Sequence, residues 1–339
     1  MRSQSEFPEM EQLLALLNKH QDKVTVKQLC QVECKTDSFP VHLISLGNAS
    51  QDKPAICFVG GVHGVERIGS QVVLSFMDSL LNRLDWDKQL LLLLEACYLV
   101  FIPIVNPSGM VLQRRANGNG VDLMRNSPSY AKGKATFMVG GQRISRRLPW
   151  YQGNKNGVME TESQAIYDFA EQHLFGRPFS LVLDCHSGFG HQDRIWFPYA
   201  KSATTAIEDI GSVYRLRQVF FESFPHQNYL FEPQTKHYVC NGDLWDYCYE
   251  QSLKRPGIFI PLTLEMGSWR WLKKNPLQVF SSLGLYHPMK PHRVQRVLRR
   301  HLVLMEFLIN ASYSWRVLHQ TEPLKCATKL AKDKWFNDK

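Results

Sequence analysis

Short apolar stretches that alternate with amphipathic stretches of helical period are the feature that most constrains the fold. Five stretches have the composition of buried strands: residues 39–47, 55–61, 97–105, 180–188 and 257–268. Apolar residues recur at helical spacing in four others: residues 9–20, 71–84, 160–175 and 291–311. Buried strands separated by amphipathic helices are typical of a parallel or mixed sheet covered on both faces. We therefore predict an α/β fold with a mixed, mainly parallel twisted sheet and helices on both faces.

The run LLLLLEACYLVFIPIV, at 90–105, is the longest apolar stretch in the chain. Glu95 interrupts it, Pro103 falls near its end, and it is too short to cross a bilayer as a helix. We interpret it as a buried strand. The first residues lack the apolar core of a signal peptide, and none of the eight cysteines forms a C-x-x-C pair. These features predict a cytoplasmic protein with no membrane segment.

The chain shows no internal repeat and no flexible linker. We divide it into an N-terminal helix and strand at 1–50 that belong to or pack on the main domain, a main domain at 51–315, and a polar tail at 316–339. Within the main domain, Thr161 is a plausible N-cap for the helix at 160–175.

Lysine and arginine outnumber acidic residues 40 to 31, which gives a formal net charge of +9. The basic residues cluster locally at 142–147 and at 292–301, where an amphipathic helix turns its arginines outward. A solvated helix face accounts for such a cluster, and no nucleic-acid-binding motif accompanies it. We therefore expect no nucleic-acid partner.

Polar side chains stand at the ends of three predicted strands. His63 and Glu66 follow the strand at 55–61, His186 lies near the end of the strand at 180–188, and Glu265 lies near the end of the strand at 257–268. Ligands of open α/β sheets bind outside the carboxyl ends of the strands. We therefore expect these four side chains to converge at one end of the sheet.

His63, Glu66 and His186 make up the ligand set of a catalytic zinc ion, which takes three protein ligands and keeps one position open. Such an ion lowers the pKa of its water to about 7, and Glu265 is then a candidate general base. Taken singly, each residue also fits a purely structural role, such as that of a hydrogen-bonded loop histidine or an ion-paired carboxylate. Their joint placement favours one zinc ion as cofactor.

Six motifs extend this pattern along the chain. They are HGVE at 63–66, NPSG at 106–109, RANGNGVDLMRN at 115–126, DCHSG at 184–188, YVCNGDLWDY at 238–247 and TLEMG at 263–267. In these motifs and their order, the sequence resembles the zinc carboxypeptidase family of the carboxypeptidase A type, metallopeptidase M14, as a non-secreted member of bacterial type. The resemblance covers about residues 54–310.

The resemblance implies a role for each matching residue. His63, Glu66 and His186 are the zinc ligands, and Glu265 activates the water and returns its proton. Arg115 stabilises the oxyanion.

Other matches concern the substrate. Arg125 pairs with its terminal carboxylate, Tyr238 closes over it, and Ser187 offers it a backbone contact. Trp245 stands at the side-chain pocket, which favours an apolar or bulky terminal group. Asp122 and Asn106 resemble architectural residues of the rim.

Two positions depart from the family pattern. Met124 stands where an amide usually helps Arg125 hold the carboxylate, and a thioether cannot donate that hydrogen bond. Asn126 or another donor then has to compensate, or the substrate is not an ordinary peptide C-terminus. Val65 replaces an arginine that precedes the glutamate ligand in digestive members.

The favoured interpretation is a zinc metallocarboxypeptidase, monomeric, that hydrolyses an amide bond at or near a free or modified carboxyl end of a peptide-like substrate. Two alternatives stay open. One is an N-acyl amino acid deacylase of the aspartoacylase or succinylglutamate type, which shares the zinc ligand set. The other is a catalytically silent binding module on the same fold.

Overall fold

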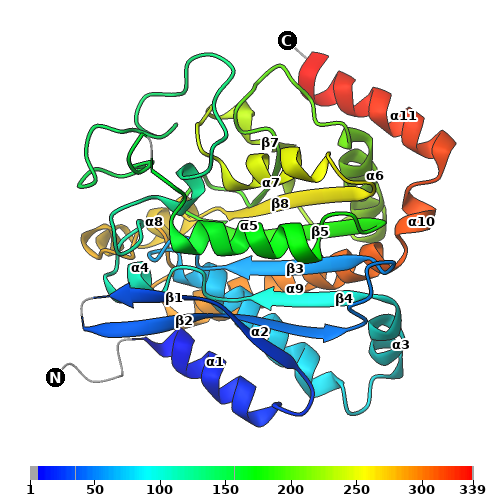
Figure 1. Cartoon of the computed structure of the whole chain (residues 1–339), viewed down its shortest axis with the longest axis horizontal. Helices are drawn as coiled ribbons and strands as arrows, with labels where there is room; N and C mark the ends of the chain where they lie inside the picture. The colour runs from blue at the N-terminus through cyan, green and yellow to red at the C-terminus, as the bar shows by residue number, and fades with distance from the viewer. Residues whose placement is uncertain (1–6, 35, 156, 338–339) are drawn as a thin grey trace.

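The computed structural model describes the chain except residues 1–6, 35, 156 and 338–339 (Figure 1). Its described residues form one eight-stranded sheet in the order β1-β2-β4-β3-β5-β8-β6-β7. The strands are β1 (Thr25–Cys34), β2 (Asp37–Gly47), β3 (Ala55–Gly60), β4 (Tyr98–Ile102), β5 (Phe179–Ser187), β6 (Arg194–Phe197), β7 (Leu230–Pro233) and β8 (Ile258–Met266).

The four central strands β4, β3, β5 and β8 run parallel. At one edge β2 is antiparallel to β4 and β1 is antiparallel to β2, and at the other edge β6 is antiparallel to β8 and parallel to β7. Every residue of β3, β4 and β5 is buried, as expected for strands covered on both faces. The predicted mixed, mainly parallel sheet is confirmed.

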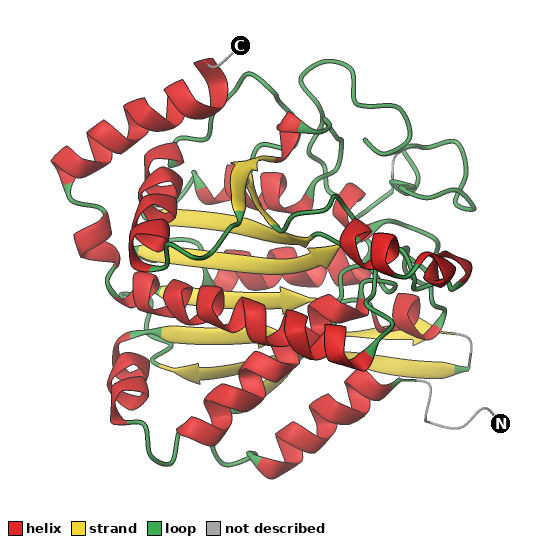
Figure 2. Ribbon diagram, turned by 180° about the vertical axis from the view of Figure 1, so that it is seen from behind, coloured by secondary structure: helices red, strands yellow, loops and turns green. Residues whose placement is uncertain are grey.

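Helices cover both faces of the sheet. On one face α2 and α9 contact β3 and β5, and on the other α5 packs against α7, which contacts β8. Figure 1 shows α5 and α7 in front of the strands, and Figure 2 shows long helices crossing the opposite face. The longer helices are α1 (Pro8–Lys19), α2 (Arg67–Arg83), α3 (Lys88–Ala96), α5 (Thr161–His173), α6 (Ile210–Ser223), α7 (Leu244–Ser252), α9 (Pro291–Tyr313) and α11 (Thr321–Lys332), and the short ones are α4 (Pro107–Val111), α8 (Trp269–Lys274) and α10 (Trp315–Leu318).

The apolar run at 90–105 is only partly a strand, which corrects the sequence prediction. Its first half belongs to α3, and β4 begins at Tyr98. The side chain of Asp87 caps α3 by accepting hydrogen bonds from the backbone N–H groups of Gln89 and Leu90. The cap and the buried residues Leu90, Leu93 and Leu94, which recur at helical spacing, explain why this leucine-rich segment is a helix and not a strand. Among the described helices, none is long and apolar enough to cross a membrane.

The segment at 316–339, predicted to be a polar tail, is mostly helical in its described residues. They form α10, α11 and a final π-helical turn at Asp333–Asn337. Helix α11 packs on α6, with Ala327 and Ala331 buried against the fold. Trp335 is buried, and its indole N–H donates to the carbonyl of Phe231 at 3.0 Å. Ala327 and Ala331 within α11, and Trp335 in the turn after it, thus attach a mostly polar helix to the rest of the fold.

Two smaller expectations also need correction. Glu160, and not Thr161, is the N-cap of α5, and it makes no side-chain capping hydrogen bond. Strands β1, β6 and β7 are absent from the sequence prediction. β1 is an edge strand whose first residues are exposed, while β6 and β7 have 4 residues each, so none carries a long apolar run.

Candidate metal centre and active site

The carboxyl ends of β3, β5 and β8 lie at one edge of the sheet, because these strands are parallel neighbours. His63 and Glu66 lie in the turn between β3 and α2. His186 and Glu265 are the next-to-last residues of β5 and β8 and are direct partners in the register. The predicted convergence of the four side chains is therefore observed.

Tight backbone packing shapes the turn that carries His63 and Glu66. Gly61 has φ +69°, a conformation that favours glycine. A Cβ atom on Gly64 would lie 2.0 Å from the carbonyl carbon of Gly109, so a side chain there cannot fit. Asn106 holds the turn from below by donating its amide to the carbonyl of Val62 at 3.1 Å. The NPSG motif thus supports the HGVE motif.

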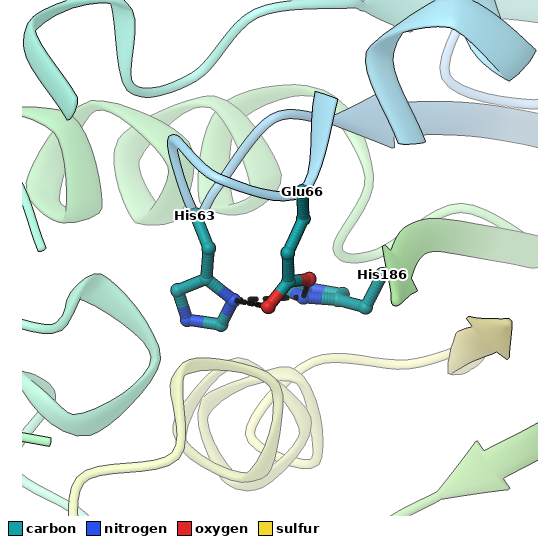
Figure 3. A group of neighbouring side chains, drawn as sticks. All are labelled: His63, Glu66 and His186. Atoms are coloured by element: carbon teal, nitrogen blue, oxygen red, sulfur yellow. Dashed lines mark hydrogen bonds and ion pairs between the residues drawn. The ribbon is translucent and has the colours of Figure 1, made fainter. Parts of the chain in front are cut away.

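His63, Glu66 and His186 present their polar atoms to one another (Figure 3). Nδ1 of His63 lies 2.9 Å from Oε1 of Glu66, and Nδ1 of His186 lies 3.0 Å from Oε2. The two Nδ1 atoms are 3.1 Å apart. All three side chains are buried, and one donor atom from each lies within 4.8 Å of the others. This arrangement can hold a metal ion.

Each imidazole has a carboxylate on its other nitrogen. Nε2 of His63 lies 3.1 Å from Oδ1 of Asp122, and Nε2 of His186 lies 2.7 Å from Oδ2 of Asp184. Metal-binding histidines typically show this pattern, because the outer carboxylate fixes the tautomer and orients the free nitrogen toward the ion. The donor set and its outer partners fit zinc.

Electrostatics favour a charged state for this cluster. Burial opposes ionisation of Glu66, but His63 and His186 lower its pKa below the usual value. Burial likewise opposes protonation of His186, but Asp184 and Glu66 raise its pKa well above the usual value. Three carboxylates, those of Glu66, Asp122 and Asp184, surround the two imidazoles, and Arg115 is the one permanent cation that pairs with them in the described structure. With neutral imidazoles the cluster therefore keeps an excess of negative charge, which a bound cation would balance.

Arg115 lies beside the cluster. Its Nη1 donates to Oε1 of Glu66 at 2.9 Å, and its Nε donates to Oδ2 of Asp122 at 2.8 Å. Asp122 therefore orients both His63 and Arg115. Burial opposes ionisation of Asp122, but Arg115 and His63 hold its pKa well below the usual value. The guanidinium is therefore fixed beside the cluster, and Arg115 lines the same cavity as Glu265.

Glu265 is 7% exposed, and its Oε1 accepts a hydrogen bond from the backbone N–H of Phe189 at 2.9 Å. Burial raises its pKa to about 8, with a further contribution from the charge of Glu66, while His186 and Arg115 oppose the rise. A carboxylate whose proton affinity is raised is better able to accept and return a proton near neutral pH.

A cavity of about 120 Å³ joins these groups to residues that the sequence assigned to substrate binding. Arg125 and Tyr238 line it, with the guanidinium carbon 5.7 Å from the centre of the tyrosine ring. Arg125 is 3% exposed and donates only to neutral carbonyls, those of Val139 and Met124. Across the part of the chain that the structure describes, no carboxylate forms an ion pair with Arg125.

Ser187 also lines the cavity, and its hydrogen bonds are made with other residues of the protein. Its backbone N–H donates to Oε2 of Glu66 at 3.0 Å, and its hydroxyl donates to the carbonyl of Tyr286 at 2.7 Å. Ser187 thus helps to position Glu66 and holds the segment at Tyr286 beside the cavity.

The structure places two predicted substrate-binding residues elsewhere. Trp245 is buried in α7 and donates its indole N–H to Oδ2 of Asp184 at 2.8 Å, because its helix faces the sheet at this point. Asn126 bonds to the carbonyl of Gln152 and the N–H of Glu160, so it ties down the loop before α5. Neither residue lines the cavity. In the described structure both make hydrogen bonds that hold neighbouring segments of the fold.

Several cavity residues carry no recognisable signal in the sequence. Asp184, which contacts His186 but does not line the cavity, does have such a signal, since it lies two positions before His186 on β5 and shares its face. The cavity residues without such a signal come from segments that only the fold brings together: Trp150, Phe189, Trp196, Gln234, Asp243, Thr263 and Tyr286.

Comparison with known proteins agrees with this architecture. The model of the family described as zinc carboxypeptidase matches residues 15–275. Carboxypeptidase SOL1 of Arabidopsis thaliana is 25% identical over 267 residues, which are 74% of this chain and 48% of the relative. Carboxypeptidase E of Caenorhabditis elegans is 26% identical over 217 residues, 57% of this chain and 43% of the relative. The chain thus spans about half the length of the curated relatives it matches.

Solved structures show the same fold at low identity. Carboxypeptidase A from Helicoverpa armigera superposes with a TM-score of 0.67 at 17% identity, over 89% of this chain and 71% of that one. Bovine thrombin-activatable fibrinolysis inhibitor, solved with a tick carboxypeptidase inhibitor, superposes with a TM-score of 0.65 at 16% identity, over 91% and 97%. Since the family model matches well over half of the sequence, this chain belongs to the zinc carboxypeptidase family.

Proposed function

We propose that the protein is a zinc-dependent metallocarboxypeptidase that hydrolyses an amide bond at or near a carboxyl-terminal residue. One observation supports this above the others: the buried His63–Glu66–His186 cluster and the buried Arg125 line the same small cavity. The charges of Asp122 and Asp243 stabilise the guanidinium without forming an ion pair with it in the described structure, so a substrate carboxylate could still pair with it directly.

The described residues divide the chemistry between them. His63, Glu66 and His186 would hold zinc, which when bound polarises the scissile carbonyl and acidifies a water molecule. Glu265 takes the proton from the attacking water and delivers it to the nitrogen of the leaving group. Arg115, held by Glu66 and Asp122, stabilises the negative charge that develops on the carbonyl oxygen.

Substrate recognition falls to the opposite wall of the cavity. Arg125 pairs with the terminal carboxylate, and the ring of Tyr238 lies beside this guanidinium, where it covers the bound end. Met124 lines the same cavity and contributes only its backbone carbonyl to Arg125. Recognition of the carboxylate therefore depends on the guanidinium more than on a neighbouring amide.

A substrate series distinguishes the proposal from the deacylase alternative. The zinc-loaded full chain should hydrolyse N-acylated dipeptides with a free carboxylate, and amidation of that carboxylate should lower kcat/KM by about 100-fold. The measurement is release of the terminal residue together with the zinc content. Hydrolysis confined to N-acyl amino acids would establish the deacylase instead, and zinc binding without hydrolysis of either class would leave a silent binding module.

Asp243 leads to a prediction about the terminal side chain. Trp245 does not line the cavity, whereas the carboxylate-bearing residue Asp243 does, together with Gln234, Thr263 and Trp196. Burial raises the pKa of Asp243 and Arg125 opposes this, and a cationic substrate side chain would favour the carboxylate further. We expect the enzyme to prefer a terminal arginine or lysine to a terminal phenylalanine, contrary to the apolar preference inferred from Trp245.

The Asp243→Asn variant tests this preference. Oδ1 of Asp243 caps α7 by accepting from the backbone N–H of Asp246, and asparagine keeps such a cap. The variant should therefore fold normally and lose about 10-fold in the ratio of kcat/KM for terminal arginine over phenylalanine. The ratio is measured on matched N-acylated dipeptides. An unchanged ratio would show that Asp243 does not contribute to recognition of the substrate's terminal side chain.

A further inference from the structure

A second cavity, of about 320 Å³, lies between α8 and the first turns of α9. None of its lining residues lines the metal-site cavity. One carboxylate, that of Asp193, faces five cationic side chains there, which are Arg270, Lys274, Arg293, Arg296 and Arg300. The basic cluster at 292–301, for which the proposed hydrolysis has no use, supplies most of this charge.

The five cations come from two helices and line one concave site, which a single solvated helix face would not produce. Lys274 and Arg296 are exposed, whereas Arg270, Arg293 and Arg300 are partly buried. Asp193 is already engaged, because it accepts from the backbone N–H of Gly267 at 2.9 Å and pairs with Arg300 at 2.6 Å. Within the described chain, no carboxylate pairs with any of the other four cations, so the cavity keeps a positive excess.

Two of the guanidinium groups are held in place by neutral groups. Arg270 donates through Nε and Nη2 to the carbonyl of His191, and Arg293 donates to the carbonyls of Trp271 and Lys274. Carbonyls orient a guanidinium without neutralising its charge. The cavity is therefore preorganised for an anion, which lowers the entropic cost of binding one.

A buried histidine gives an independent indication of a ligand. His301 lines the cavity and is fully buried, with Nδ1 2.8 Å from the hydroxyl of Tyr229. Its Nε2 atom, also buried, has no hydrogen-bond partner among the described residues. Because an unpaired buried polar atom is costly, a ligand bound beside His301 could supply the missing partner.

We propose that this cavity binds a small phosphorylated ligand, a phosphate monoester or polyphosphate. A phosphate carries up to two charges and three or more acceptor oxygens that point in different directions, which matches donors arriving from both helices. A single carboxylate offers one charge in one plane. The volume also exceeds what one phosphate group fills, which leaves room for a second phosphate or an organic group.

Isothermal titration calorimetry of the zinc-loaded full chain with sodium tripolyphosphate, at about 0.15 M salt, tests the site. Lys274→Gln/Arg296→Gln removes two cavity cations that make no ion pair in the described structure. Lys273→Gln/Arg299→Gln removes two exposed neighbours on the same helices that do not line the cavity. We expect saturable binding that the first pair weakens at least about 10-fold and the second pair leaves within about 2-fold.

The matched variants also control for chelation of zinc by the probe, which would be the same in both. In addition, the ring resonances of His301 should shift on titration of the unmodified protein. Equal losses in the two double variants would assign the binding to general surface charge and overturn the proposal, as would the absence of saturable binding.

Two further titrations identify the source of the phosphate. Retention on vesicles containing about 20 mol% phosphatidic acid, lost in Lys274→Gln/Arg296→Gln, supports a lipid headgroup. Binding of inorganic phosphate and tripolyphosphate without vesicle retention supports a soluble ligand. Failure of all three probes contradicts the site.

Discussion

Replacing Glu265 with glutamine should lower kcat by about 10²- to 10⁴-fold, the range for loss of a positioned general base. Glutamine has nearly the same shape, and its side-chain oxygen can still accept from the backbone N–H of Phe189. It cannot accept a proton from water or return one to the leaving nitrogen. KM should change little, because Arg125 and Tyr238 remain in place.

The control for this variant is Glu162→Gln. Glu162 is also a buried glutamate, 3% exposed, but it bonds to Asn117 and lies outside the cavity. We expect kcat within about 3-fold of the unmodified protein and a similar melting temperature. A Glu265→Gln enzyme that retains zinc and full kcat would contradict the assignment of Glu265 as base.

The parts of the site that follow from topology could be predicted from the sequence. Parallel strands have their carboxyl ends at one edge of the sheet, so the positions of His63, His186 and Glu265 at strand ends are enough to predict one site. His63 and Glu66 are expected just after the strand at 55–61, and the structure has them in the turn between β3 and α2. In these cases a local pattern and a general rule of sheets were sufficient.

The parts that depend on side-chain direction could not be predicted. Trp245 and Asp243 are two residues apart at the start of α7, and only the rotation of that helix decides that Asp243 faces the cavity while Trp245 faces Asp184. Tyr286 reaches the site from a segment far along the chain. Motif spacing carries no information on helix rotation, so the match of Trp245 to the family's side-chain pocket could not show which of the two residues lines the cavity.

Removal of zinc should abolish hydrolysis and also destabilise the fold, and the second effect gives a readout independent of activity. A ligand that binds only the folded state stabilises it by about 4 kcal/mol at a concentration a thousand times its Kd. Without the ion, Glu66 and the outer carboxylates Asp122 and Asp184 keep only the imidazoles and Arg115 as counter-charges. We therefore expect a chelator to lower the melting temperature by several degrees, and about one equivalent of Zn²⁺ to restore both properties.

The Asp184→Asn variant sharpens the same prediction. Asp184 contacts Nε2 of His186 and accepts the indole N–H of Trp245, so asparagine preserves a hydrogen bond while removing the charge that orients the ligand. Loss of such an outer partner typically lowers metal affinity about 10- to 100-fold. The variant should release zinc at a correspondingly lower chelator concentration yet retain activity when saturated with zinc. Chelation could instead leave both the melting temperature and the activity of the unmodified protein unchanged. The cluster would then be a network held by hydrogen bonds alone and not a metal centre, because such a network contains no ion for the chelator to remove.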